Sequence, residues 1–193
     1  MTILELEDKI LLAVNGFHAP WADTLMWTAS GRFVWFPLYF LLACLMFRNK
    51  GWKQALVWIM GIALVIFITD QTCVHSGLRQ LIARPRPCNL AENPIAPLVR
   101  VLEGYRSGRY GFPSAHAANT SALVCYITLV LRKCWLALCL VVWCALVCYS
   151  RMYLGVHYLG DLLGGIFIGV LFASLVYIVI NKFVLPRLNC ANL

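Results

Sequence analysis

Five long apolar runs, separated by short connections, constrain the fold of this chain more than any other feature. They cover about residues 26–47, 54–74, 114–131, 134–150 and 158–181. These lengths reach or approach the ~20 helical residues that cross a ~30 Å hydrocarbon core. Because 62% of the 193 residues are hydrophobic and only 12% are charged, the composition is unlike that of a soluble domain. We therefore predict an all-α fold, a polytopic transmembrane helix bundle of about five spans, in a single membrane-embedded domain over residues 1–193.

The amino-terminal segment 3–17 is predicted to form an amphipathic helix. Its apolar side would carry Leu4, Leu11, Leu12 and Phe17, and its polar side Glu5, Asp8 and Lys9. Several charged residues in so short a segment disfavour a membrane crossing, so we expect the helix to lie along the membrane surface. Acidic residues stand where a signal peptide has its basic region, so no cleavable signal is expected.

Basic residues in the short connections predict how the helices cross the membrane. Seven of them fall on one side: Arg48, Lys50, Lys53, Arg132, Lys133, Lys182 and Arg187. The positive-inside rule makes that side of a multi-pass membrane protein cytoplasmic, and we expect the opposite side to be periplasmic. An inverted orientation is the alternative that the charges leave open. Since the basic residues flank membrane spans, the net charge of +8 predicts no nucleic-acid partner.

The loop at about 75–112 falls on the predicted periplasmic side, yet it is rich in arginine: Arg79, Arg84, Arg86, Arg100, Arg106 and Arg109. Arginines placed there against the rule suggest an anionic ligand. Arg79 and Arg86 are the strongest candidates. They stand about two helical turns apart, and each guanidinium group can donate two hydrogen bonds to the oxygens of one phosphate. Pro85 and Pro87 stiffen the backbone around Arg86. The alternative for both, and the expectation for the other four, is ordinary extension toward the interface.

A second polar cluster opens the third apolar run. Ser114 follows Pro113 at a position typical of a helix N-cap, where its hydroxyl and the free N–H groups suit a phosphate oxygen. His116 could protonate a departing oxygen. The alternative is that Ser114 only caps the helix and His116 lies in the headgroup zone.

A third cluster joins the last two runs. His157 and Asp161 are four residues apart at the predicted start of a helix, so their side chains share a face. A carboxylate there can fix the imidazole tautomer and leave Nε2 as a nucleophile or base. Arg151 precedes His157 across a turn and can reach the same space. The alternative is an ordinary polar contact without a catalytic role.

Together the clusters resemble the signature of the type 2 phosphatidic acid phosphatase (PAP2) superfamily, which includes bacterial lipid phosphatases and vanadium haloperoxidases. That signature reads Lys-x6-Arg-Pro, Pro-Ser-Gly-His and Ser-Arg-x5-His-x3-Asp. The chain is similar to it at 79–87, 113–116 and 150–161, so the motif-bearing region is about 75–165. Arg79 replaces the usual lysine, which keeps the charge. Ala115 replaces the usual glycine, which keeps the N–H but adds a methyl group.

The resemblance implies a mechanism. His157 would attack phosphorus and form a phosphohistidine, Asp161 would orient His157, and His116 would protonate the leaving oxygen and then activate water. The phosphate would be held by a set of cations and polar groups: Arg79, Arg86, Ser114, Ala115 and Arg151. No metal and no cofactor are expected, because the arginines supply the positive field.

The resemblance to small bacterial members implies a location in the bacterial inner membrane. The substrate implied is a lipid phosphate or diphosphate whose tail stays in the bilayer. Undecaprenyl diphosphate and a lipid A phosphate rank first, followed by phosphatidylglycerol phosphate and phosphatidic acid. A lipid phosphotransferase with the same phosphohistidine is an alternative enzyme. A non-enzymatic anionic-lipid transporter or scaffold, and a vanadium-dependent peroxidase, are further alternatives.

Four smaller expectations concern residues outside these clusters. A polar group that ends the second run either pairs with Arg79 or Arg86 or is merely solvated: Asp70, Gln71 and His75. Asp23 and Arg32 are expected to be membrane anchors. Small residues four apart, Gly160 with Gly164 and Gly165 with Gly169, favour close packing within the bundle over dimerisation. Cys73 and Cys88 form either a disulfide or two free thiols, and free thiols are favoured.

Overall fold

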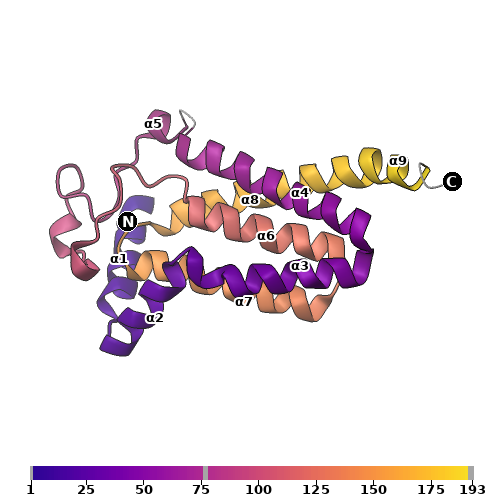
Figure 1. Ribbon diagram of the computed structural model, residues 1–193. Helices are drawn as coiled ribbons and strands as arrows, with labels where there is room; N and C mark the ends of the chain where they lie inside the picture. The colour runs from indigo at the N-terminus through magenta and orange to yellow at the C-terminus, as the bar shows by residue number, and fades with distance from the viewer. Residues whose placement is uncertain (1, 76–77, 191–193) are drawn as a thin grey trace.

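The computed structural model describes residues 2–75 and 78–190, and within these ranges its regular structure is helical. Outside the helices, the described residues contribute one isolated β-bridge, between Pro85 and Tyr110. The all-α prediction is therefore confirmed. The long helices run side by side in an elongated bundle, with the amino-terminal helices and the long loop gathered at one end (Figure 1).

The helices follow the chain in a simple order. The α-helices are α1 Ile3–Gly16, α2 Pro20–Ser30, α3 Phe36–Lys50, α4 Trp52–Asp70, α5 Leu78–Ile82, α6 Ala115–Leu131, α7 Cys134–Tyr153, α8 Leu159–Val179 and α9 Leu185–Cys190. Short π-helical segments, Gln71–His75 and Ile180–Val184, extend α4 and α8. Short 3-10 turns occupy Phe33–Trp35, Ala96–Leu98 and Leu102–Gly104.

Helices occupy all five predicted spans, but they are not equivalent. The stretches that contain α4, α7 and α8 are long and apolar enough to cross a membrane. The pair α2 and α3 forms a fourth candidate span that is bent by 77°. Helix α6 is apolar but has only 17 residues, fewer than the ~20 that cross a hydrocarbon core.

The first predicted run, 26–47, is not one continuous helix. Helix α2 ends at Ser30, and Gly31 adopts an extended backbone with φ −72° and ψ 138°. The chain resumes as α3 with Pro37 in its first turn, where a missing N–H costs nothing. As a result α2 lies across the end of the bundle, while α3 runs along it (Figure 1).

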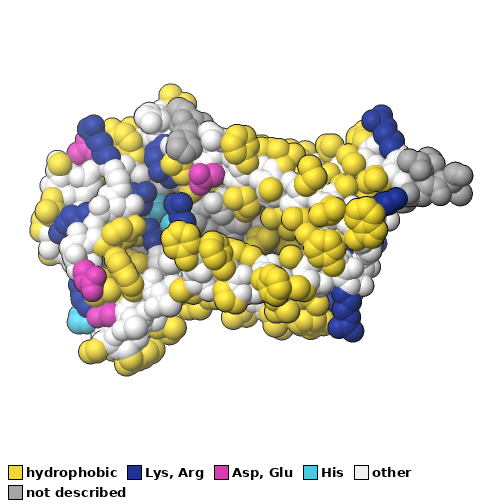
Figure 2. Space-filling model, viewed as in Figure 1, with side chains coloured by type: hydrophobic (Ala, Val, Ile, Leu, Met, Phe, Trp, Pro, Cys, Tyr) yellow, Lys and Arg dark blue, Asp and Glu magenta, His cyan; other side chains and the backbone are white. Residues whose placement is uncertain are grey.

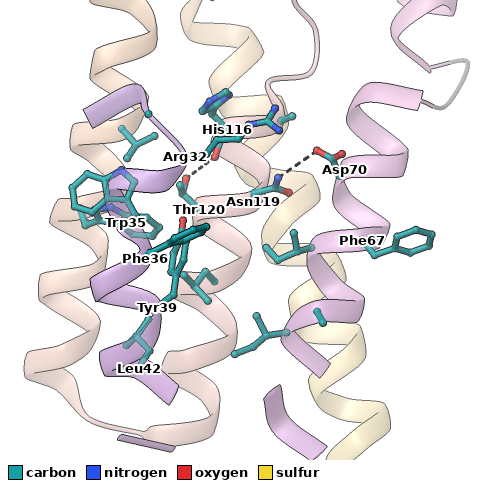
Figure 3. Close-up of a pocket in the computed structure, with 18 of the residues that line it drawn as sticks. Arg32, Trp35, Phe36, Tyr39, Leu42, Phe67, Asp70, His116, Asn119 and Thr120 are labelled. Carbon is teal, nitrogen blue, oxygen red and sulfur yellow. Dashed lines mark hydrogen bonds between the residues drawn. The ribbon is translucent and has the colours of Figure 1, made fainter. Parts of the chain in front are cut away.

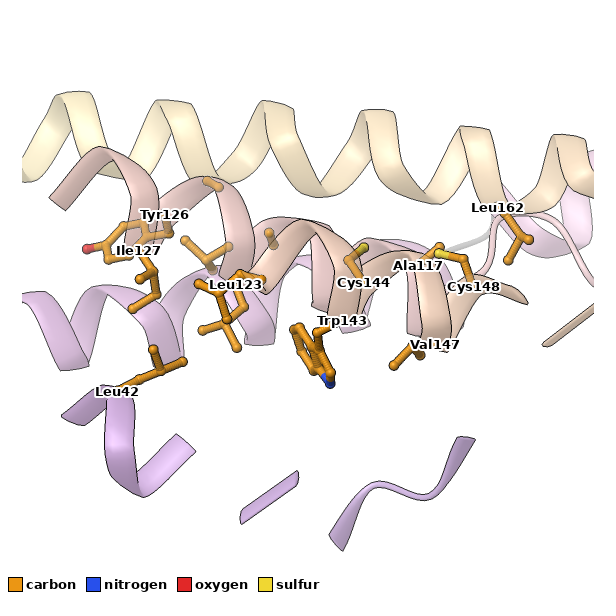
Figure 4. Close-up of a cluster of buried hydrophobic side chains, with 14 of the residues drawn as sticks. Leu42, Ala117, Leu123, Tyr126, Ile127, Trp143, Cys144, Val147, Cys148 and Leu162 are labelled. Carbon is orange, nitrogen blue, oxygen red and sulfur yellow. The ribbon is translucent and has the colours of Figure 1, made fainter. Parts of the chain in front are cut away.

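Helix α6 lies at the centre of the core, between α4, α7 and α8. Its Tyr126 and Ile127 are fully buried, and they belong to a cluster shared with Trp143 of α7 (Figure 4). Glycines bring α8 close: a Cβ atom at Gly165 would stand 2.4 Å from the carbonyl oxygen of Ser114, the N-cap of α6, and one at Gly169 would stand 2.2 Å from that of Ala118 in α6. The small residues therefore serve packing within the bundle, as expected.

Helix α1 is tied to the bundle more firmly than a helix resting on a membrane surface. Leu11 is fully buried, whereas Leu4 and Phe17 are exposed. The buried side chain of Asn15 donates hydrogen bonds of 2.8 Å to the carbonyl oxygens of Arg100 and Tyr153. These contacts dock α1 against both the long loop and α7.

Charges gather at both ends of the bundle, and the sides are largely apolar (Figure 2). The α3–α4 and α6–α7 turns lie together at the end opposite the long loop (Figure 1). They carry basic residues: Arg48, Lys50, Lys53, Arg132 and Lys133. Cys73 and Cys88 are buried free thiols rather than a disulfide.

Candidate active site

Three segments that are distant in the sequence meet at the loop end of the bundle. The side chain of Arg86, from the loop, donates a 2.9 Å hydrogen bond to the carbonyl oxygen of Val156 in the α7–α8 turn. The backbone N–H of Ser114, at the start of α6, donates a 3.0 Å hydrogen bond to the carbonyl oxygen of Asp161 in α8. The three sequence clusters therefore lie at one site.

His157 and Asp161 are buried together at the start of α8. His157 Nδ1 lies 3.4 Å from Asp161 Oδ2, and the two side chains are 2% and 0% exposed. The same Oδ2 accepts a 3.0 Å hydrogen bond from the backbone N–H of Tyr158. His157 Nδ1 has no hydrogen-bond partner among the described residues, so its contact with the carboxylate is electrostatic. The pair occurs where the four-residue spacing predicted it.

The other ring nitrogen of His157 faces a guanidinium group. Arg86 Nη1 lies 2.9 Å from His157 Nε2. A guanidinium group only donates, so this contact requires a lone pair on Nε2 and leaves the ring proton on Nδ1, beside Asp161. Burial, together with the charges of Arg86, Arg151 and Arg79, lowers the pKa of His157 well below its ordinary 6.5. The imidazole is therefore neutral at neutral pH, with Nε2 able to act as a nucleophile.

Buried guanidinium groups surround this imidazole. Arg86 and Arg151 are 5% and 3% exposed, and half-buried Arg79 donates a 3.1 Å hydrogen bond to the Pro113 carbonyl oxygen. Burial and the neighbouring Arg79 and Arg151 lower the pKa of Arg86 to about 10, so it remains charged at neutral pH. In the described part of the chain, the Nε atoms of all three arginines are buried without a hydrogen-bond partner. An anion would satisfy these donors and relieve the repulsion between the cations.

The start of α6 completes the site. Ser114 is its N-cap, and the buried hydroxyl oxygen accepts a 3.5 Å hydrogen bond from the Ala117 N–H. Ala115 is the first residue of the helix. His116 follows, close enough to Arg151 and Arg86 for their charges to act on its ring. The structure thus brings together all the residues that the sequence assigned to catalysis and phosphate binding.

Arg84 departs from its expected role. Instead of extending toward the interface, it donates a 3.1 Å hydrogen bond to Asp161 Oδ1 and forms an ion pair with Glu7 of α1. No sequence pattern predicted this contact, because 77 residues separate Arg84 from each of its two acidic partners. It depends on how α1 and the loop dock on the bundle.

The remaining loop arginines are also held by the protein. Arg100 pairs with Asp23 at 2.6 Å, so neither residue is a simple interfacial anchor. Arg109 pairs with Glu92 on the surface. Arg106 donates to the Cys88 carbonyl oxygen. The expectation that these groups would extend toward lipid was wrong, because the loop folds back over the end of the bundle and offers them acceptors.

Two further residues that the sequence did not single out lie beside the site. Tyr105 interacts through its hydroxyl with Arg151 and packs edge-on against Trp27, with ring centroids 5.2 Å apart. Gly111 lies against Asp161, where a Cβ atom would be 2.7 Å from Oδ2. Gly111 begins the second cluster, Gly111–His116, but no role was assigned to it, whereas nothing in the sequence marked Tyr105.

The polar residues at the end of α4 lie near the site. Asp70 accepts a 3.5 Å hydrogen bond from Asn119 of α6, and its charge acts on Arg79 from farther away. Gln71 lines the neighbouring cavity. The side chain of His75 lies outside the described residues. Arg32, expected to be an anchor, lines the same cavity, and its charge acts on His116.

A cavity of about 750 Å³ opens beside His116 and continues between α3, α4 and α6 (Figure 3). Near the site its wall is polar, with Arg32, Asp70 and Asn119. Farther along, the lining is almost entirely apolar: Trp35, Phe36, Leu42, Met46, Ile59, Ile62, Ile66 and Leu123. Figure 2 shows a histidine and arginines at the surface beside a hollow of the apolar side. The cavity therefore extends from His116, at the edge of the cationic site, along an apolar lining between the helices.

Comparison with known proteins gives consistent results. Residues 55–185 match the model of the PAP2 superfamily. A lipid A 4'-phosphatase from Bacteroides thetaiotaomicron is 41% identical over 92% of this chain and 78% of its own length. A lipid A 4'-phosphatase from Porphyromonas gingivalis is 31% identical over 91% of this chain and 73% of its own length.

The fold is also that of a solved structure. A transmembrane PAP2-type phosphatidylglycerolphosphate phosphatase from Bacillus subtilis superposes with a TM-score of 0.67, over 94% of this chain and 87% of that one. Its sequence identity is 22%, so this likeness concerns the fold. The family match covers most of the chain and contains every clustered motif residue, and the chain belongs to the PAP2 superfamily.

Proposed function

We propose that this membrane lipid phosphatase hydrolyses a phosphate monoester of lipid A through a phosphohistidine formed on His157. The observation that carries the proposal is the 2.9 Å contact between Arg86 Nη1 and Nε2 of the buried His157, in a cluster that contains further arginines and His116, which lines an apolar cavity. The choice of lipid A is supported by the two relatives named lipid A 4'-phosphatases. Undecaprenyl diphosphate, which the sequence ranked equally, has no such support.

The first step transfers the phosphoryl group to the enzyme. Arg79, Arg86 and Arg151 bind the phosphoryl oxygens, together with the Ser114 hydroxyl and the N–H groups that open α6. The lone pair of His157 Nε2 forms the new P–N bond as the P–O bond to the sugar breaks. The bound phosphate offsets the positive charge of the arginines and thereby favours a protonated His116, which gives its proton to the departing oxygen, so the leaving hydroxyl group is neutral.

The second step returns the enzyme to its starting state. His116, now neutral, accepts a proton from water as the water oxygen attacks phosphorus. The P–N bond breaks, and its electron pair returns to Nε2. While the phosphoryl group is attached, His157 carries it with a proton on Nδ1, and the Asp161 carboxylate offsets the positive charge of the ring. Inorganic phosphate then leaves.

The cavity supplies a place for part of the lipid. Its volume of about 750 Å³ lies within the usual range for small-molecule sites, so it would enclose one portion of an acyl chain and not a whole lipid. A phosphate held beside His116 would leave an attached chain free to lie between α3 and α4, which face the bilayer with exposed apolar residues such as Phe40 and Phe67. This arrangement favours a substrate that remains in the membrane.

We also propose that the site faces the periplasm across the bacterial inner membrane. The support is the position of the basic α3–α4 and α6–α7 turns at the opposite end of the bundle, which the positive-inside rule makes cytoplasmic. Cysteine accessibility in intact cells tests this orientation. In a variant whose nine native cysteines are replaced by alanine, a single cysteine introduced at Gly108 should react with a membrane-impermeant thiol reagent, and one introduced at Lys133 should react only after lysis. The reverse pattern would mean an inverted protein.

A phosphate-release panel tests the substrate. The purified protein in detergent is given bisphosphorylated lipid A, undecaprenyl diphosphate, phosphatidylglycerol phosphate or phosphatidic acid, and the lipid products are analysed by mass spectrometry. We expect the highest kcat/KM for lipid A, with loss of one phosphate. Release of free phosphate from a single lipid without an acceptor also argues against the phosphotransferase alternative. A clear preference for another lipid contradicts the assignment.

A further inference from the structure

We propose that Glu7 and Arg84 are positioning residues that hold Asp161, and through it His157, in the reactive orientation. Helix α1 would then be part of the catalytic machinery and not only a membrane-surface element. The inference rests on the proposed function in one respect, since it assumes that the His157–Asp161 pair performs the chemistry. Neither Glu7 nor Arg84 is one of the residues that define the family signature.

The two oxygens of Asp161 have separate partners. Oδ2 lies 3.4 Å from His157 Nδ1 and accepts the Tyr158 N–H at 3.0 Å. Oδ1 is held by Arg84 Nη1 at 3.1 Å. A carboxylate bound at both oxygens cannot rotate about its terminal torsion without losing a charge-assisted bond. Arg84 therefore keeps Oδ2 directed at the imidazole.

Arg84 is itself held in place on several sides. Its guanidinium group lies over the ring of Tyr158, with Cζ 4.4 Å from the ring centroid. Its carbonyl oxygen accepts a 2.9 Å hydrogen bond from the Gly111 N–H. The ion pair with Glu7 fixes the remaining end of the guanidinium group. With its side chain only 19% exposed, Arg84 has few other positions available.

Glu7 acts on Asp161 by two routes. Its carboxylate pairs with Arg84, and its Oε1 also accepts a 2.6 Å hydrogen bond from the backbone N–H of Gly160, the residue before Asp161. A carboxylate at the amino-terminal end of α8 is favoured by the helix dipole. The absence of a side chain at Gly160 permits this approach, because a Cβ atom there would be 2.5 Å from Glu7 Oε1.

The charges explain why a second carboxylate is useful. When His157 attacks phosphorus, positive charge develops on its ring, and Asp161 stabilises that charge only while it stays anionic and correctly directed. Arg84 alone would compete with His157 for the carboxylate. Because Glu7 shares Arg84, the guanidinium group restrains Asp161 without neutralising it completely. Removing Arg84 would instead leave two buried carboxylates facing each other, which is costly.

Kinetics of charge-removing variants test the proposal. Glu7→Gln, Arg84→Gln and Asp161→Asn are compared with Glu92→Gln, which breaks the surface ion pair with Arg109. We expect Glu7→Gln and Arg84→Gln to lower kcat by about 10- to 100-fold with little change in KM, as for a misplaced reacting group. The Glu92→Gln control should keep its full kcat. All rates are expressed per folded protein, from the monodisperse fraction, so a loss of folding does not count as a loss of kcat.

The activity of the double variant distinguishes a positioning role from a merely structural one. Because Glu7→Gln removes the carboxylate that faces Asp161 when Arg84 is absent, Glu7→Gln/Arg84→Gln should retain more activity than the product of the two single losses predicts. Arg84→Lys, which keeps the charge, should recover part of the activity of Arg84→Gln.

The outcomes separate this inference from the proposed function. If Asp161→Asn is impaired but Glu7→Gln and Arg84→Gln match the Glu92→Gln control, the positioning role is wrong and the proposed function stands. If Asp161→Asn itself keeps the full kcat, the His157–Asp161 mechanism fails. Strictly multiplicative losses in the double variant would also overturn the coupling between Glu7 and Arg84.

Discussion

The backbone of Gly111 lies against the carboxylate of Asp161. A Cβ atom at residue 111 would stand 2.7 Å from Asp161 Oδ2, the oxygen that faces His157, and 3.4 Å from Arg86 Cγ. The restriction is one of space: the loop passes so close to the catalytic pair that no side chain fits between them. The lack of a side chain at residue 111 is therefore needed for the placement of the Asp161 carboxylate, although glycine carries no functional group.

Gly111→Ala should therefore impair catalysis. The added methyl group must displace either the Asp161 carboxylate or the loop, and we expect kcat to fall by about 10- to 100-fold because a reacting group is misplaced. The matched control is Gly108→Ala in the same loop, where a Cβ atom meets nothing within 4 Å. Steady-state phosphate release from a lipid phosphate measures both. Equal activity of the two variants would contradict the placement of the loop.

The protonation of His157 gives a second prediction. Burial and the charges of Arg86, Arg151 and Arg79 lower its pKa well below 6.5, so the ring should remain neutral as the pH falls through about 6.5. Arg86→Gln removes one of the repelling charges and should raise the pKa of His157 toward its ordinary value. NMR titration of 13C-labelled histidine measures this, with His157→Gln used for assignment. A His157 signal that titrates near 6.5 in the unchanged protein is the contrary result.

The same shift affects stability. Since the unfolded chain binds a proton at His157 more readily than the folded protein does, this histidine favours folding fully only above the unfolded pKa of 6.5. Its contribution is lost as the pH falls below that value.

The apolar cavity gives a third prediction, about lipid chains. Ala63→Phe places a ring among the lining residues, and it should raise KM for a long-chain lipid phosphate while leaving the hydrolysis of a short soluble phosphate ester unchanged. Leu64→Phe, at the next residue, changes an exposed side chain that does not line the cavity, and serves as the control. If both variants behave alike toward both substrates, the cavity does not hold the chain.

Close packing of α6 and α8 gives a prediction about stability. Gly169→Ala would bring a Cβ atom to 2.2 Å from the Ala118 carbonyl oxygen, so the helices must separate. Overpacking of this kind costs about 1–3 kcal/mol, and the thermal unfolding midpoint in detergent should fall. At Gly16, a Cβ atom meets nothing within 4 Å, so Gly16→Ala should leave the midpoint almost unchanged. An unaltered midpoint for Gly169→Ala would contradict the contact.

The sequence predicted the parts of the site that depend on local spacing. His157 and Asp161 share a helix face because they are four residues apart, and apolar runs determine the helices that carry them. The contacts of Arg84 with Glu7 and Asp161 could not be predicted. Each joins residues that are 77 positions apart, and both depend on how α1 and the loop dock. The break after α2 was not predicted either. Residues 26–47 form one largely apolar run, and its hydrophobic pattern shows no periodic change where the helix bends.

The most direct test of the central claim is a single-turnover experiment with a lipid substrate that carries a 32P-labelled phosphate. Rapid quenching under alkaline denaturing conditions should trap label on the protein, acid-labile as expected of a phosphohistidine, and peptide mapping should place it on His157. His157→Ala should give no labelled protein and a rate at least ~10²-fold lower. Label that survives in His157→Ala, or near-normal hydrolysis by that variant, would contradict the account.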